Sequence, residues 1–257
     1  MNFLEEKPSI VLEANKAKRN PNVVLQFLIF LAVFIVAQIA SGIVTAIVTG
    51  PYTYSKLMNS GLDLTDTKAI TEFSKTTLVQ DPFIILSSLF VTVIATILVI
   101  IYCKFIEKRS LYSMGFVKKR ALTDYLIGLV IGFVMFSAAV LICVAKGTLN
   151  YEGVVFKGSV GLIVLFFLGF VLQGMNEEVI CRGYFMNSLA SRRPIILAII
   201  ANSVIFGLMH MMNSGVAVLP IVNIILVGVF FSVFMLKSDS IWGVCAIHTM
   251  WNFVQGN

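Results

Sequence analysis

The chain has 257 residues, of which 58% are hydrophobic and only 12% are charged, and its mean hydropathy is +0.95. Soluble domains carry about 25% charged residues, so this composition excludes an ordinary soluble protein and indicates a polytopic helical membrane protein. The net charge of +6 comes from basic residues scattered through short loops. Because they form no continuous basic face, we expect membrane lipid as the surrounding partner and no nucleic-acid partner.

Residues 1–22 are polar and contain Pro8 and Pro21, which predicts a cytoplasmic arm with little fixed structure. The apolar run that follows, 23–49, is longer than the signal-peptide core of about 7–15 residues. It also exceeds the roughly 20 residues that cross the hydrocarbon of a bilayer. Residues 23–257 are therefore predicted to form one membrane-embedded domain, and no internal repeat is visible in their sequence.

Six further apolar runs follow the first along the chain. They cover residues 83–102, 125–145, 159 to about 186, 194–212, 216–236 and 241 to the end. Lys and Arg concentrate in the cytoplasmic loops of membrane proteins, and the arm and the loops at 103–124 and 187–194 are basic. The sequence thus predicts an all-α transmembrane bundle of about seven spans with a cytoplasmic N-terminus. Such a multi-pass protein suits the bacterial plasma membrane.

The four cysteines, Cys103, Cys143, Cys181 and Cys245, are widely spaced, and most of them fall in or beside apolar runs. Small reduced cysteines are common in protein cores, and we expect that role for all four. Cys181 lies beside two glutamates, where a nucleophile could act, but packing explains its position as well as chemistry does.

Two adjacent glutamates, Glu177 and Glu178, lie near the end of the fourth apolar run. An ionisable side chain at membrane depth is costly, so its presence suggests a functional site. Residues four apart share a helix face, so Glu178 and Arg182 are predicted to form an ion pair, unless both snorkel toward the interface. Glu177 points about 100° away on the helix, near Gln173. This separation leaves one carboxylate neutralised and the other free to act as a general base.

Two later apolar runs also carry polar side chains at helical spacing. Asn202, Phe206 and His210 lie four residues apart on one stripe, and His248 and Asn252 do the same in the last run. A single histidine on an apolar helix is more often a satisfied core residue than a catalyst. Taken together with the glutamates, however, these groups predict an active site inside the membrane.

The expected depths of these residues agree with one shared site. Glu177 lies sixteen residues before Arg193 and His210 seventeen residues after it, so the two are nearly level in antiparallel helices. Counted from the turn that precedes its own helix, His248 lies closer to the cytoplasmic end than Glu177 and His210 do. The difference is roughly 10 Å at about 1.5 Å per residue. We therefore expect the hairpin around Arg193 to project into the cytoplasm by about that amount, which brings the three side chains together.

Three motifs summarise this pattern: Glu177-Glu178-x-x-x-Arg182, Phe206-x-x-x-His210 and His248-x-x-x-Asn252. In content and order they resemble the motifs of the CPBP intramembrane proteases. That family includes the type II CAAX prenyl endopeptidases and Abi-like bacteriocin-processing or immunity proteins. The resemblance covers about residues 120–257, which would form the protease-like core, whereas the arm and the first two runs match nothing particular.

The resemblance implies an intramembrane endopeptidase that hydrolyses a peptide bond of a membrane-bound or lipid-anchored peptide near the cytoplasmic face. Glu177 with His210 would activate the attacking water, and His248 with Asn252 would stabilise the tetrahedral oxyanion. The remaining two motif residues would support this geometry: Glu178 and Arg182. The chain ends five residues after Asn252, so we expect a short last span or a truncated chain.

A metal is the open question in this chemistry, because family members are often described as metalloproteases. The chain has no His-Glu-x-x-His motif and is not a zincin by sequence. Glu177, His210 and His248 could supply the three protein ligands of a catalytic zinc ion. The same three side chains could also perform acid–base chemistry without a metal, and this version is favoured.

Two other functions fit part of the pattern. One is a non-catalytic membrane scaffold or regulator of the same fold, although a protein without activity has no chemical reason to keep all six polar motif residues. The other is a transporter or proton relay, but the sequence shows neither an inverted repeat nor paired broken helices. Peptide maturation or self-immunity against a bacteriocin is expected by family analogy alone. Substrate, cleavage site and oligomeric state have no visible sequence signal.

Overall fold

The computed structural model describes residues 6–19, 21–153, 159–212 and 217–256. Throughout these ranges the chain consists of helices joined by turns and short loops, with no strand. Five helical segments of the described chain are long and apolar enough to cross a membrane: Val23–Met58, Pro82–Ile106, Ala121–Ala145, Val160–Ala190 and Val218–Ser238. The predicted all-α, polytopic membrane architecture is therefore confirmed.

The α-helices are, in chain order, α1 (Ser9–Ala14), α2 (Val23–Met58), α3 (Thr67–Phe73), α4 (Pro82–Ile101), α5 (Ala121–Ala145), α6 (Val160–Glu178), α7 (Asn187–Ala190), α8 (Ile195–Met209), α9 (Val218–Ser238) and α10 (Trp242–Gly256). Three π-helical turns continue α3, α4 and α6: η1 (Ser74–Leu78), η2 (Tyr102–Ile106) and η4 (Val179–Met186). The described residues also contain two 3₁₀ turns: η3 (Tyr112–Met114) and η5 (His210–Met212).

Two of the seven predicted spans are short helices in the structure. The helices α8 and α10 contain 15 residues each, whereas a helix needs about 20 to cross the hydrocarbon. The predicted count of seven is not confirmed, and the predicted start of the sixth span at residue 216 lies outside the described residues. The side of the membrane on which the N-terminus lies stays a prediction.

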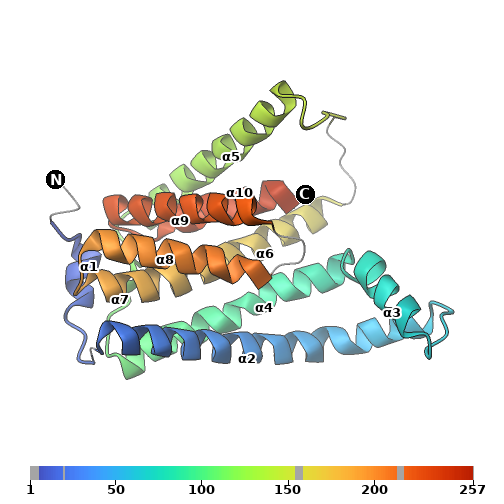
Figure 1. The fold of residues 1–257 in the computed structure, drawn as a ribbon, viewed down its shortest axis with the longest axis horizontal. Helices are drawn as coiled ribbons and strands as arrows, with labels where there is room; N and C mark the ends of the chain where they lie inside the picture. Colours follow the sequence, from blue (N-terminus) through green and yellow to red (C-terminus); the bar gives the residue numbers. More distant parts are fainter. Residues whose placement is uncertain (1–5, 20, 154–158, 213–216, 257) are drawn as a thin grey trace.

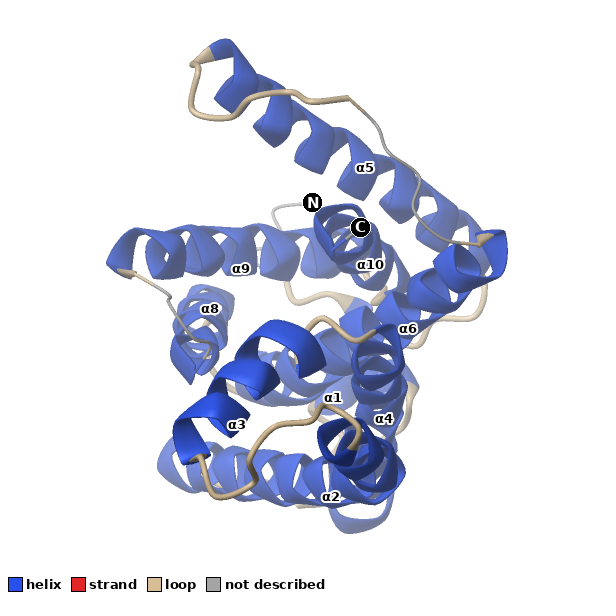
Figure 2. Ribbon diagram, turned by 90° about the vertical axis from the view of Figure 1, so that its right-hand side faces the viewer, coloured by secondary structure: helices blue, strands red, loops and turns tan. Residues whose placement is uncertain are grey.

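The packing order places the end of α6 and its continuation η4 next to the other two motif-bearing helices, α8 and α10. The helix α10 packs against both α5 and α6, α6 also packs against α4, and α4 packs against α2. On the other side of the bundle α8 packs against α9 (Figure 2). The turn η4 contacts both of these helices. The C-terminal end of α5 diverges from the bundle (Figure 1). The end of α6 therefore lies among the helices that carry the other motif residues.

The distribution of polar and apolar side chains is that of a membrane protein. Large apolar side chains point outward, and Leu122 and Val218, for example, are 73% and 80% exposed. Extensive exposed apolar surface of this kind marks contact with lipid. Some of the most polar side chains are instead buried, and Glu178 and Arg182 are both 0% exposed. These two polar motif residues thus lie inside the bundle.

The N-terminal arm has more fixed structure than the sequence predicted. Ile10 and Val11 of α1 are fully buried, and this helix packs against η3 and α7. Asp239, in the turn between α9 and α10, accepts hydrogen bonds from the backbone N–H groups of Ile10 (3.0 Å) and Ser9 (3.3 Å). Because a carboxylate stabilises a helix N-terminus, the expectation of little fixed structure is wrong for residues 9–14. Residues 1–5 and 20 of the arm lie outside the described residues.

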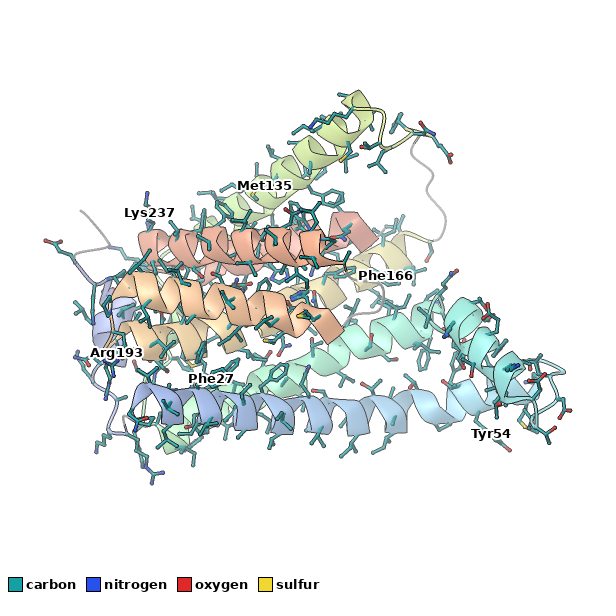
Figure 3. The ribbon with its side chains drawn as sticks, in the orientation of Figure 1. Phe27, Tyr54, Met135, Phe166, Arg193 and Lys237 are labelled. Atoms are coloured by element: carbon teal, nitrogen blue, oxygen red, sulfur yellow. The ribbon has the colours of Figure 1, made fainter. Side chains whose placement is uncertain are left out.

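The basic loops lie together at one end of the bundle. Lys7 donates to the carbonyl of Ser191 (2.9 Å), and Arg120 donates to the carbonyl of Ser238 (2.8 Å). Figure 3 shows Arg193 at this end and Tyr54 at the opposite end. One end of the bundle therefore carries all of these basic segments: the arm, residues 103–124 and the turns after α7 and α9. Helices that cross the membrane in alternating directions require this arrangement.

The opposite end of the bundle is tied together by Asp81, just before α4. Its carboxylate accepts hydrogen bonds from the backbone N–H groups of Phe83 (2.9 Å) and Ile84 (3.3 Å), and from Tyr52 and Lys56 of α2. Burial by itself would raise the pKa of Asp81, but the hydrogen bonds, that from Lys56 foremost, outweigh burial and hold this pKa below its ordinary value. The ionised carboxylate thus links α4 to α2.

Glycines allow α5 to approach α10 closely. A Cβ atom on Gly128 would lie 2.3 Å from the carbonyl oxygen of Gly243, and one on Gly132 would lie 2.5 Å from the carbonyl oxygen of Ile247. Both distances are well below the van der Waals contact of about 3.5 Å. Any side chain at these positions must push the two helices apart.

We predict that Gly128→Ala lowers the thermal unfolding midpoint of the detergent-purified protein, because overpacking costs about 1–3 kcal/mol. Gly42→Ala in α2 is the matched control, since a Cβ atom at that position meets nothing within 4 Å. Equal midpoints for the two variants would show that the contact between α5 and α10 does not limit stability.

Candidate active site

Glu178 and Arg182 form the predicted ion pair in the interior of the bundle. Arg182 Nη1 lies 2.9 Å from Glu178 Oε1, and both side chains are 0% exposed. The guanidinium group also lies 4.1 Å from the ring centroid of Phe206 and 5.5 Å from that of Phe231, which adds cation–π attraction. Snorkelling toward the interface is therefore excluded for this pair.

Asn202 of α8 and two residues of α9 complete the surroundings of Arg182. In the amide orientation that satisfies both of its polar atoms, Asn202 donates to the carbonyl of Cys181 (2.8 Å) and accepts from Arg182 Nε (3.2 Å) and Ser232 Oγ (3.2 Å). The carbonyl of Gly228 accepts from Arg182 Nη2 (3.4 Å). Helices α8 and α9 thus position the arginine of α6, and the sequence had not singled out the residues of α9.

His248 of α10 contacts both glutamates. Its Nδ1 atom lies 2.8 Å from Glu178 Oε1, and its Nε2 atom lies 3.6 Å from Glu177 Oε2. The same Glu178 oxygen therefore binds Arg182 and His248 together. The sequence predicted the first of these two bonds, whereas the second depends on how α10 packs against α6.

His210 approaches Glu177 from the C-terminal end of α8. Its Nδ1 atom lies 2.8 Å from the carbonyl oxygen of Phe206, and its Nε2 atom lies 3.8 Å from Glu177 Oε2. The predicted convergence of Glu177, His210 and His248 is thus observed in the structure. The predicted projection of the hairpin from the membrane stays a prediction.

The hydrogen bonds of the two imidazoles determine which nitrogen faces the site. A backbone carbonyl only accepts, so His210 carries a proton on Nδ1, and the Glu178 carboxylate requires the same of His248. Both rings therefore turn Nε2 toward Glu177 Oε2, a buried oxygen without a hydrogen-bond partner among the described residues. Separations of 3.6 and 3.8 Å are too long for direct hydrogen bonds and fit a bridging water molecule.

Asn252 and Gln173 extend the site along α10 and α6. Asn252 Nδ2 donates to Gln173 Oε1 (2.8 Å), and Gln173 Nε2 donates in turn to Glu177 Oε1. The sequence placed Gln173 near Glu177 but did not include it among the site residues. The four-residue spacing between Gln173 and Glu177 could have indicated that Gln173 belongs to the site.

The site is closed on one side and accessible on the other. The side chains of Glu178 and His248 are 0% and 7% exposed, whereas those of Glu177 and His210 are 21% and 24% exposed. A molecule outside the bundle can therefore reach the site on the side of Glu177 and His210. The buried wall keeps bulk water away from the ion pair, which strengthens its electrostatic effect.

A second buried arginine holds the π-helical turn η4, which follows Glu178. Arg109 donates to the carbonyls of Gly183 (3.1 Å) and Tyr184 (3.3 Å) and pairs with Glu107 at 3.2 Å. π-Helical turns are frequent at functional sites, and here the turn carries Arg182. In the sequence Arg109 belongs to a basic loop, and only the fold shows that it is 5% exposed.

The predicted core role of the cysteines holds for three of the four. All four are free thiols in the described chain; Cys103, Cys181 and Cys245 are buried, whereas Cys143 is only half-buried. Cys181 contributes its backbone carbonyl to the surroundings of the ion pair, as an acceptor for Asn202.

The structure gives no support to the predicted zinc alternative. Among the described residues, no group of three or more His, Cys, Asp or Glu side chains is arranged to hold a metal ion. One oxygen of Glu177 is engaged by Gln173, and the other faces the two imidazoles at a spacing that fits a water molecule. No step of the chemistry proposed below passes through a metal.

Residues 159–254 match the sequence model of the type II CAAX prenyl endopeptidase Rce1-like family. This segment contains all three motifs, so the match confirms the family resemblance that they predicted. No curated protein and no solved structure matches the chain. The protein is thus an integral membrane protein with a CAAX-protease-like C-terminal part.

We predict that Arg182→Met lowers stability by about 3–5 kcal/mol, because it leaves the Glu178 charge buried without its cationic partner. Thermal unfolding in detergent measures the loss. The double variant Glu178→Gln/Arg182→Met removes both charges and should recover part of the stability. A double variant no more stable than Arg182→Met would contradict the ion-pair explanation.

Proposed function

We propose that this protein is an intramembrane endopeptidase that hydrolyses a peptide bond of a membrane-associated or lipid-anchored peptide near the cytoplasmic face. One observation carries the proposal: Glu177 Oε2 is buried without a partner in the described part of the chain and faces the Nε2 atoms of His210 and His248. A carboxylate oxygen beside two imidazoles suits a general base that activates water. The family match supports the same class of reaction.

Charge balance favours one additional proton in the site. Two carboxylates and the Arg182 guanidinium leave one net negative charge in a buried cluster, which is costly. A proton on one imidazole makes the cluster neutral. His248 is the better position, because it contacts Glu178 at 2.8 Å and Glu177 at 3.6 Å, whereas His210 contacts Glu177 at 3.8 Å. With both nitrogens protonated, His248 presents an Nε2–H donor to the substrate.

In the proposed first step, Glu177 Oε2 and the Nε2 lone pair of His210 hold the attacking water molecule. The water oxygen bonds to the carbonyl carbon of the substrate, Glu177 takes up a water proton, and the carbonyl oxygen becomes an oxyanion. The Nε2–H of His248 and an amide N–H of Asn252 stabilise this charge. Donors already in position before the reaction are the most effective means of such stabilisation.

In the second step the tetrahedral intermediate collapses. The carbonyl double bond re-forms, the bond between carbon and nitrogen breaks, and Glu177 passes its proton to the departing amine. Glu178 and Arg182 take no part in the bond changes and instead keep His248 in place. The products are a new carboxyl group, which keeps the second proton of the water molecule, and a new amine terminus.

The biological role that we propose rests on family analogy. In a bacterial plasma membrane, such a protease would mature a peptide or protect the cell against a bacteriocin. A non-catalytic scaffold of the same fold is the alternative, and the first experiment below distinguishes the two.

We predict that Glu177→Ala abolishes peptide cleavage. Mass spectrometry of peptide termini in membranes containing either protein should detect termini that appear only with the unaltered chain, because loss of a general base slows hydrolysis by about 10²–10⁴-fold. These termini would also identify the substrate and the cleaved bond.

The matched control is Glu72→Gln, which removes an exposed carboxylate from α3. It should leave the termini unchanged at equal expression. Indistinguishable termini for Glu177→Ala and the unaltered protein would refute catalysis and favour the scaffold.

Metal removal tests the metal-free chemistry separately. We predict that phenanthroline or EDTA leaves the cleavage rate of the purified protein unchanged, since Glu177 and His210 activate water directly. A loss of activity that added zinc restores would establish the metal-dependent alternative.

A further inference from the structure

We propose that Gln173 is a positioning residue that orients the Asn252 amide for catalysis. This role rests on the proposed function and adds a residue that lies outside the three motifs. Gln173 connects the proposed base, Glu177, with a proposed oxyanion donor, Asn252, through two hydrogen bonds.

The helix register explains why one side chain reaches both partners. On α6, Gln173 lies four residues before Glu177, and on α10, Asn252 lies four residues after His248. Because the two helices run antiparallel here, Glu177 faces His248 while Gln173 faces Asn252. Residues four apart share a helix face, so these two contacts between α6 and α10 lie one helical turn apart.

The charge of Glu177 determines the orientation of the Gln173 amide. A carboxylate accepts hydrogen bonds and offers no donor, so Gln173 must turn its NH₂ group toward Glu177 and its carbonyl oxygen away. That oxygen is then the acceptor for Asn252 Nδ2 at 2.8 Å. Through Gln173, the carboxylate thus determines that the NH₂ group of Asn252, and not its carbonyl oxygen, faces Gln173.

This orientation matters because the two ends of an amide have opposite functions. An oxyanion requires a donor, and the carbonyl end of Asn252 would repel it. One N–H of Asn252 binds Gln173, and the second N–H of the same NH₂ group remains to serve the oxyanion. Without Gln173, rotation by about 180° about the terminal bond would interchange donor and acceptor with little penalty.

The test uses full-length protein in vesicles of phosphatidylethanolamine and phosphatidylglycerol. The probe is a synthetic peptide that spans the bond identified from the peptide termini. We expect Gln173→Met to lower kcat by roughly 10–100-fold, the equivalent of one hydrogen bond to a charged group, with KM unchanged. Asn176→Leu is the control, because it removes an amide of α6 that binds Thr96 of α4 (3.2 Å), and its kcat should stay within about twofold.

A double-mutant cycle separates positioning from a general structural effect. If Gln173 acts through Asn252, the two substitutions remove the same contribution to kcat. The loss in kcat of the combined variant Gln173→Met/Asn252→Ala should then be about tenfold smaller than the product of the two single losses. Independent effects on kcat would multiply and would overturn the proposal. Gln173→Leu replaces Gln173→Met in the cycle if that variant does not fold.

The outcomes distinguish this role from the proposed function. An inactive Glu177→Ala protein together with an unchanged kcat for Gln173→Met would overturn the positioning role alone. An active Glu177→Ala protein would overturn the proposed function and, with it, the role of Gln173. A fall in kcat with non-multiplying effects would support both.

Discussion

The burial of Arg182 is the constraint on which the rest of the site depends. A guanidinium and a carboxylate that leave water lose several kcal/mol each in solvation, and excellent pairing must offset that loss. Glu178 supplies the charge at 2.9 Å, and Asn202, Phe206 and Gly228 supply the remaining contacts. Because these partners come from α6, α8 and α9, the ion pair can be buried with all of its contacts only when the three helices meet in one arrangement.

The same ion pair positions a group of the proposed mechanism, His248. Glu178 Oε1 binds Arg182 and also fixes Nδ1 of His248, so the imidazole turns its Nε2 toward Glu177. The neighbouring carboxylate, one residue earlier, is thereby left to face two imidazoles. Adjacent glutamates thus acquire different environments, since successive residues of a helix point about 100° apart. One is held as a structural anion, and the other is available for chemistry.

Some contacts of the site follow from the spacing of residues along one helix, and others do not. The Glu178–Arg182 pair follows from four-residue spacing alone, as does the stripe that joins Phe206 to His210. The bond from His248 to Glu178 does not, because it joins residues seventy positions apart. Arg109 is similar: in the sequence it is one of several basic loop residues, yet it is buried and binds the carbonyls of η4.

Element boundaries were also partly decided by packing. The first span was expected to end at residue 49, just before a Gly-Pro pair, but α2 continues to Met58 with Pro51 inside it. The arm was expected to lack fixed structure, yet the carboxylate of Asp239 caps α1 and its apolar side chains are buried. Both differences arise from partners that are distant in the chain and that no local pattern contains.

By itself the sequence determined that the protein is an all-α membrane protein, and it indicated which six polar motif residues belong together, since hydropathy and helical spacing are local properties. Only the tertiary structure decided that the Glu177 oxygen faces two imidazole nitrogens and that Gln173 connects Glu177 to Asn252. These contacts depend on the register of α6, α8 and α10 against one another. That register results from close packing between helices and from the need to pair every buried charge, and neither can be read from one helix alone.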